Sequence, residues 1–165
     1  MATADPRIDG RVFIQLEDDR YTHVDGDDVR CPETGEVHPA FIPVLEHLGL
    51  TYADISTSGS VVHAHYTGEL PIDGKTQATI ELDTEPWGAN DTAPSVEFHA
   101  GKRLCVTTGE HVDGTPLDLS EWDHDALRAI LEAHGYNDRE PVSHDTDRER
   151  QKSRPTNPRR PNGPK

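Results

Sequence analysis

The chain has 165 residues, a length that suits one domain. Hydrophobic residues make up 32% and aromatic residues 5%, so part of the chain is expected to lie outside a packed core. The formal net charge of -15, from 16 basic and 31 acidic residues, excludes attraction of the whole chain to nucleic acid in dilute buffer. Two interpretations remain. Either the protein works at high salt, where charges are screened, or it binds a cationic ligand such as a divalent metal. Many acids with few lysines are also typical of halophile proteins.

The elements follow from apolar spacing. Residues 11–16 (RVFIQL) predict a strand, and residues 21–24 (YTHV) predict its hairpin partner. Apolar residues at helical spacing then predict a helix that ends at Gly49. Further strands are expected at residues 61–66, 77–83, 95–99 and 103–108. A last helix is expected to be capped by Ser120 or Asp123 and to end at Gly135. This order predicts an α+β fold with an antiparallel or mixed sheet.

The composition changes at the end of the chain. Residues 148–165 hold seven basic residues and one acid, which leaves 9 basic and 30 acidic residues in the rest, a balance of -21. Charge, Pro and Asn dominate residues 137–165, so this segment is predicted to be a disordered, basic, Pro-rich tail after a folded domain of residues 10–136. The tail either binds nucleic acid or is a solubilising terminus.

Three strand segments carry polar side chains two residues apart, which places both members on one face. These pairs are Asp25 and Asp27, His63 and His65, and Glu97 and His99. Carboxylates on neighbouring strands with a histidine nearby suit a two-metal centre for phosphoryl transfer, and oxygen ligands suit Mg²⁺ or Mn²⁺. Spacing alone leaves open that these residues are ordinary surface groups of an acidic chain.

Other sites and targeting signals are sparse. Cys31 and Cys105 leave a disulfide open, but they are too few for a zinc ribbon. No stretch approaches the roughly 18 apolar residues of a membrane span, and the first ten residues have no apolar signal region. The protein is therefore expected to be cytoplasmic, without a membrane partner.

Three segments resemble, in order, the motifs of the archaeo-eukaryotic primase superfamily. They are VDGDDVRCPETGEVHP, STSGSVVHAHYTGELP and VEFHAGKRLCVTTGEHVDGTP. The nearest resemblance is to the primase-polymerase domain of phages, plasmids and archaeal mobile elements, over roughly residues 10–116. The resemblance implies an RRM-like catalytic sheet with flanking helices.

The resemblance also implies roles for single residues. Asp25, Asp27 and Glu97 match the carboxylates that hold two Mg²⁺ or Mn²⁺ ions. His63 and Arg103 match the residues that contact the phosphates of the incoming nucleotide. The turn at Ser58 and Gly59 and the closing pair Thr108 and Gly109 complete the nucleotide site. The implied activity is nucleotidyl transfer from nucleoside triphosphates on a single-stranded DNA template, as a DNA primase or polymerase, alongside a separate helicase or replication protein.

The sequence departs from the family pattern at several points. Val61 stands in place of a glycine, and His99 stands in place of a tyrosine. The family has a further helical segment before the position of Arg11. Three interpretations of this chain are therefore open: a minimal version of the domain, a subunit completed by another chain, or a truncated remnant. The alternatives to an enzyme of this class are a non-catalytic accessory module that binds nucleic acid and a two-metal nuclease.

Overall fold

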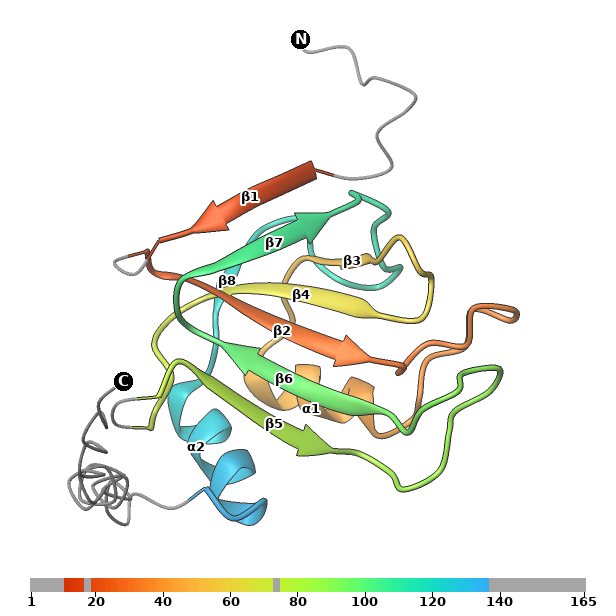
Figure 1. Cartoon of the computed structure of the whole chain (residues 1–165). Coiled ribbons are helices and arrows are strands. Elements are labelled where there is room, and N and C mark those ends of the chain that lie inside the picture. The colour runs from red at the N-terminus through yellow and green to blue at the C-terminus, as the bar shows by residue number, and fades with distance from the viewer. Residues whose placement is uncertain (1–10, 17–18, 73–74, 137–165) are drawn as a thin grey trace, which may run out of the picture.

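A computed structural model describes residues 11–16, 19–72 and 75–136, shown in Figure 1. The predicted tail, residues 137–165, lies outside the described residues. The described part is α+β, as predicted. In chain order its elements are β1 (Arg11–Gln15), β2 (Tyr21–Asp27), α1 (Phe41–Leu48), β3 (Ala53–Ile55), β4 (Val62–Thr67), β5 (Gln77–Glu81), β6 (Ser95–His99), β7 (Arg103–Thr107), β8 (Ser120–Glu121) and α2 (His124–Ala133).

The main sheet has six strands, and β2 lies at its centre. The strand order is β3-β4-β2-β6-β5, with every one of these pairs antiparallel, and β8 adds a short parallel pairing to β4. The chain leaves β2, passes through α1 and returns as β3, while β4 fills the space between β2 and β3. This arrangement is a split β-α-β unit, and it places the residues of β2 between two partner strands.

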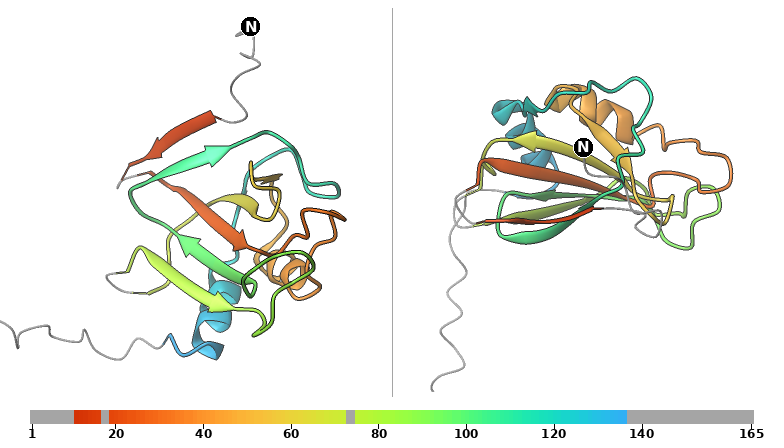
Figure 2. Two further views of the ribbon diagram at one scale, coloured as in Figure 1. Left: turned by 45° about the vertical axis from the view of Figure 1, so that its right-hand side comes forward. Right: turned by 90° about the horizontal axis from the view of Figure 1, so that it is seen from above.

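Alternation along the strands gives the main sheet one apolar and one polar face. Val24, Ala64 and Phe98 point to the apolar face and are fully buried. Helices α1 and α2 cover this face (Figure 2), and Phe41, Leu45, Leu48, Leu127 and Leu131 fill the core from the helix side. The alternate residues therefore point away from the helices, and these are the histidines and acids singled out in the sequence.

A two-stranded antiparallel sheet of β1 and β7 lies on the polar side of the main sheet (Figure 2). The predicted hairpin between residues 11–16 and 21–24 is wrong: β1 pairs with β7, and both edges of β2 pair with β4 and β6. Once β2 is the central strand, no edge is left for β1. Residues of β7 that point inward, such as Cys105, are buried against the polar face.

The outward face of β1 and β7 is apolar and exposed. Val12 pairs with Val106 and Ile14 pairs with Leu104, and all four side chains are exposed. The two helices are shorter than a membrane span, and no helix in the described ranges is long and apolar enough to cross a bilayer. Cys31 and Cys105 are buried free thiols, so the disulfide left open by the sequence is not formed.

The helix ends follow the predicted signals. Asp123, one of the two predicted caps, begins α2: its carboxylate accepts hydrogen bonds from the backbone N–H groups of Asp125 at 3.0 Å and Ala126 at 2.9 Å. Gly135, just after α2, has φ of 86°, a value that favours glycine. The strand that carries Asp25 and Asp27 extends further than predicted, to Asp27, and the chain turns at Asp28 with φ of 51°.

Candidate metal centre

The centre of the polar face is Asp25, because the register of three strands places acidic and imidazole groups around it. Asp25 of β2 lies opposite His63 of β4 on one side and opposite Glu97 of β6 on the other. Two residues earlier on β2, and on the same face, His23 lies between His65 and His99. The three strand pairs predicted from spacing therefore meet on one surface.

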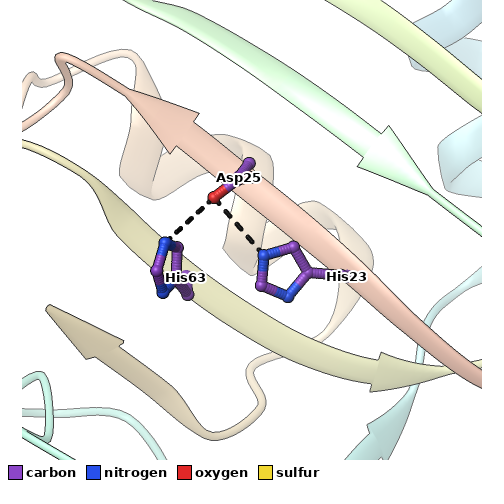
Figure 3. Close-up of side chains that lie close together, drawn as sticks. All are labelled: His23, Asp25 and His63. Carbon is purple, nitrogen blue, oxygen red and sulfur yellow. Dashed lines mark ion pairs between the residues drawn. The ribbon is translucent and has the colours of Figure 1, made fainter. Parts of the chain in front are cut away.

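Two histidines approach the same oxygen of Asp25 (Figure 3). His23 Nε2 lies 3.3 Å and His63 Nε2 lies 3.2 Å from Asp25 Oδ1. These three ligand atoms all lie within 4.8 Å of one another. His23 was not singled out in the sequence, although its position two residues before Asp25 on the same strand was a signal that could have identified it.

A second group shares Asp25 on its other side. Ligand atoms of Asp25, Glu97 and His99 also lie within 4.8 Å of one another, and His99 Nε2 is 2.9 Å from Glu97 Oε2. Arg103 of β7 reaches into this group, with its Nη2 atom 3.3 Å from Asp25 Oδ2. Arg103 and two of the three carboxylates implied by the resemblance, Asp25 and Glu97, thus lie together.

Asp27 lies at the end of this group rather than in either set of converging atoms. Burial and the charges of Asp25, Glu97 and Asp28 raise the pKa of Asp27 to about 6. A bound cation would reduce the repulsion between the Asp27 carboxylate and these acidic neighbours. This is consistent with a ligand role, although the side chain does not converge on Asp25 in this structure.

Asp54 of β3 is a second buried carboxylate, and sequence reasoning missed it. It is fully buried, and its Oδ2 atom accepts hydrogen bonds from the backbone N–H groups of Thr108 at 2.7 Å and Gly109 at 3.0 Å, and from the Thr107 hydroxyl at 2.5 Å. Its Oδ1 atom lies 2.8 Å from His65 Nε2. Burial alone would raise the pKa of Asp54, but these hydrogen bonds outweigh it and hold the pKa well below its usual value.

A chain of hydrogen bonds leads from Asp54 back to His23. His65 Nε2 contacts Asp54, His65 Nδ1 contacts the hydroxyl of Tyr21, and the same hydroxyl lies 3.3 Å from His23 Nδ1. Burial, together with the nearby carboxylates, raises the pKa of Tyr21 well above its usual value, so the phenol keeps its proton. This chain is entirely within the layer between the two sheets.

The electrostatic balance of the layer keeps the central carboxylate ionised and His23 neutral. Burial opposes ionisation of Asp25, but His23, His63 and Arg103 hold its pKa at about 2. Burial lowers the pKa of His23 to about 4 in spite of the Asp25 carboxylate. Burial also acts on His63, but there Asp54 and Asp25 outweigh it and the pKa is raised.

These residues fit a divalent cation, and the environment of Asp25 Oδ1 supports a metal ion at this position. Asp25 Oδ1 is buried and accepts no hydrogen bond from the described residues, although two imidazole nitrogens lie near it. Buried carboxylate oxygens normally have a partner. An oxygen that faces nitrogen ligand atoms without a hydrogen bond is a suitable position for a metal ion.

A cavity of about 320 Å³ opens beside the second group. Glu97, His99, Lys102 and Arg103 are among the residues that line it. Lys102 and Arg103, two cationic side chains beside the carboxylate of Glu97, form a surface on which a phosphate group and a metal ion could both be held.

The other residues implied by the resemblance are more distant or already engaged. Ser58 and Gly59 form the turn that leads into β4, where Arg30 Nη1 donates to the carbonyl of Gly59 at 2.6 Å. Thr108 donates through its hydroxyl to the carbonyl of Ile55 at 2.6 Å. Since the N–H groups of Thr108 and Gly109 bind Asp54, they position β3 rather than face the cavity.

Comparison with known proteins does not extend this description: no protein-family model matches the chain, and no curated protein is significantly similar to it.

Proposed function

We propose that this chain is a metal-dependent nucleotidyltransferase of the primase-polymerase type, acting on nucleoside triphosphates and a single-stranded DNA template. The observation that carries the proposal is the position of Asp25, in register with Glu97 on one neighbouring strand and His63 on the other, with Arg103 at its second oxygen. The three motifs are far apart in the sequence, and they meet at this one carboxylate.

The topology supports the same proposal. The order β3-β4-β2-β6 around the split β-α-β unit is the order of an RRM-like sheet, with the acidic residues on the central strand and the helices on the opposite face. The difference is in the second half, where β5 leads directly to β6 and α2 follows only after β8. No helix covers the polar face. β1 and β7 lie over part of it, and the cavity beside Glu97, Lys102 and Arg103 is where a nucleotide would bind.

The residues have distinct tasks in this proposal. Asp25, Asp27 and Glu97 would hold Mg²⁺ or Mn²⁺, which when bound lower the pKa of a primer 3′-hydroxyl and neutralise charge on the phosphates. Arg103 and Lys102 line the cavity beside Glu97 and would bind the triphosphate directly. His63, next to Asp25, would support the phosphates from the β4 side. A separate helicase or replication protein would supply the unwound template.

The test is nucleotide incorporation on a primed single-stranded template with Mn²⁺ or Mg²⁺ in about 1 M KCl, where charge repulsion is screened. We expect extension by the wild type and none by the Asp25→Ala/Asp27→Ala double variant. The matched control is Asp113→Ala/Asp118→Ala, which removes two exposed acids from the loop before β8 and should extend normally. A folded wild type that binds the template without extending it would contradict the proposal and favour an accessory module, and template degradation would favour a nuclease.

A further inference from the structure

We propose that His23, Asp25 and His63 form a binding site for a transition-metal ion of the zinc and cobalt class. The inference goes beyond the proposed function, because it adds two imidazole ligands and a different class of ion to the carboxylate centre. It also stands without any nucleotide chemistry, since it rests on the arrangement of three ligand atoms in the layer between the sheets.

The spacing of the ligand atoms is the first argument. The distances from Asp25 Oδ1 are 3.3 Å to His23 Nε2 and 3.2 Å to His63 Nε2. Two ligands of a tetrahedral zinc ion, each about 2.0–2.1 Å from the metal, stand roughly 3.3 Å apart. Two neighbouring ligands of an octahedral Mg²⁺ at about 2.0–2.1 Å would stand roughly 2.9 Å apart. Both distances from Asp25 Oδ1 are closer to the tetrahedral value.

The hydrogen-bond chain supplies the second argument, because the contact of Tyr21 with His23 Nδ1 favours a proton on that nitrogen rather than on Nε2. When the Tyr21 hydroxyl donates its hydrogen to His65 Nδ1, the Tyr21 oxygen is left only as an acceptor. The Tyr21 oxygen then accepts from His23 Nδ1–H. His23 Nε2 is therefore left with a lone pair directed toward Asp25.

This lone pair faces a carboxylate oxygen that has no hydrogen bond of its own. Two lone pairs at 3.3 Å repel each other unless a proton or a metal ion lies between them, and a proton held on His23 Nδ1 leaves this position to the metal. A metal-ligating histidine usually has its other nitrogen fixed by a hydrogen bond, and the Tyr21 hydroxyl gives His23 that support. On the other imidazole, His63 Nδ1 lies 3.7 Å from the Asp54 carboxylate, whose charge favours a proton on that nitrogen.

The ligand set indicates the class of ion. Imidazole nitrogens suit zinc and its transition-metal neighbours, whereas Mg²⁺ and Ca²⁺ prefer oxygen. Three protein ligands leave a fourth position for water or another ligand, as in catalytic rather than structural zinc sites. In the protein without nucleotide, His63 would thus be a metal ligand instead of the phosphate contact that the resemblance implies.

The experiment titrates metal-free full-length protein with Co²⁺, followed by visible absorption, and with Zn²⁺, followed by calorimetry, in the absence of nucleotide. We expect one equivalent of either ion to bind. Bound Co²⁺ should show the intense visible bands of a four-coordinate ion, and millimolar Mg²⁺ should displace neither ion. In the wild type, nitrogen NMR shifts of the imidazole groups of His23 and His63 should change on Zn²⁺ addition. This readout requires no variant.

The variants identify the ligands. His23→Asn should weaken Zn²⁺ binding by more than the roughly 100-fold that loss of an outer-shell partner can cost. The same substitution at the exposed His47 of α1 is the matched control and should leave binding unchanged. His99→Asn should also leave it unchanged, since His99 belongs to the second group. His63→Asn provides a second ligand variant if His23→Asn does not fold.

Three outcomes would overturn the site: no Zn²⁺ binding by the wild type, unchanged binding in both folded ligand variants, or loss of binding in His99→Asn alone. The last outcome would place the ion at Glu97 and His99. A protein that binds Zn²⁺ as expected but does not incorporate nucleotides would refute only the proposed function. The two hypotheses therefore fail separately.

Discussion

Tyr21 connects His65, which contacts Asp54, to His23, which lies beside Asp25, because its hydroxyl lies between the two imidazole groups. We predict that Tyr21→Phe lowers Zn²⁺ affinity by about 10- to 100-fold, the range observed for outer-shell partners of metal ligands. It should also lower the free energy of unfolding by about 1–3 kcal/mol, since two buried imidazole nitrogens lose this partner. Calorimetric Zn²⁺ titration and urea unfolding measure the two effects.

The matched control is Tyr136→Phe, which removes a hydroxyl that bonds to the backbone of Thr79 on β5. It should affect stability without affecting Zn²⁺ affinity. Equal Zn²⁺ affinity in Tyr21→Phe and the wild type would mean that the tautomer of His23 is set in another way.

The charge of Asp27 is predicted to lower the free energy of unfolding of the metal-free protein. Its folded pKa of about 6 lies above the usual value of 3.8, so the charge destabilises the folded protein at pH values above about 6 and has no effect below 3.8. In metal-free protein, Asp27→Asn should raise the free energy of unfolding by about 1–2 kcal/mol at pH 8, after allowance for partial solvent screening. The gain should shrink as the pH falls through 6 and vanish near pH 3.8.

Chemical unfolding in the presence of a chelator, at a series of pH values, checks this prediction. Asp113→Asn, an exposed acid of the loop before β8, serves as the control and should show no such gain. A gain from Asp27→Asn that is equally large at pH 4 and pH 8 would contradict the electrostatic cause.

The sequence identified the members of the centre unevenly, for physical reasons. Asp25, Glu97 and His63 could be predicted because each lies in a strand with a recognisable period-2 pair. Asp54 could not, since three residues of β3 are too few to show alternation, and its partners come from a distant loop. The role of Tyr21 depends on the register between β2 and β4, which no local pattern contains.

At the scale of elements, β2 positions the centre through its contact with α1. Gly26 lies between Asp25 and Asp27 on the helix side, where a Cβ atom would be 2.6 Å from Phe41 Cε2 and 2.8 Å from Val29 Cγ2. We predict that Gly26→Ala costs about 1–3 kcal/mol of stability, as overpacking does, and displaces both aspartates. Urea unfolding and Zn²⁺ titration should both record the change.

The double-variant cycle with Phe41→Leu tests the cause. Phe41→Leu removes the ring atoms that the new methyl would meet, so its own cost should be smaller in the Gly26→Ala background than in the wild type. Strictly additive effects would contradict the clash and indicate a general loss of strand stability.

The elements themselves were largely predictable, whereas their pairing was not. Apolar spacing identified both helices and the longer strands, and Asp123 was one of two predicted caps. The predicted hairpin between β1 and β2 failed because proximity in sequence was taken for pairing. Val24 and Phe98 share one core with residues of both helices, and this long-range packing is not contained in strand propensity.

For the whole molecule, the main electrostatic fact is a net charge of -15 on 165 residues. Like charges at this density repel one another, and the repulsion is greatest when the protein is compact. Raising the salt from 0.1 M to 1 M shortens the Debye length from about 10 Å to about 3 Å, so most of this repulsion is screened. Salt is therefore expected to stabilise this fold.

We predict that the melting temperature at pH 8 rises by several degrees between about 0.1 M and 1 M KCl, since about 1 kcal/mol shifts it by roughly 2–8 °C in domains of this size. The control is the same titration near pH 4.9, the isoelectric point expected from the sequence, where the net charge is small and the rise should largely disappear. An equal rise at both pH values would assign the stabilisation to exclusion of salt from the protein surface rather than to screening. In that case the acidic composition would not be the reason why high salt stabilises this fold.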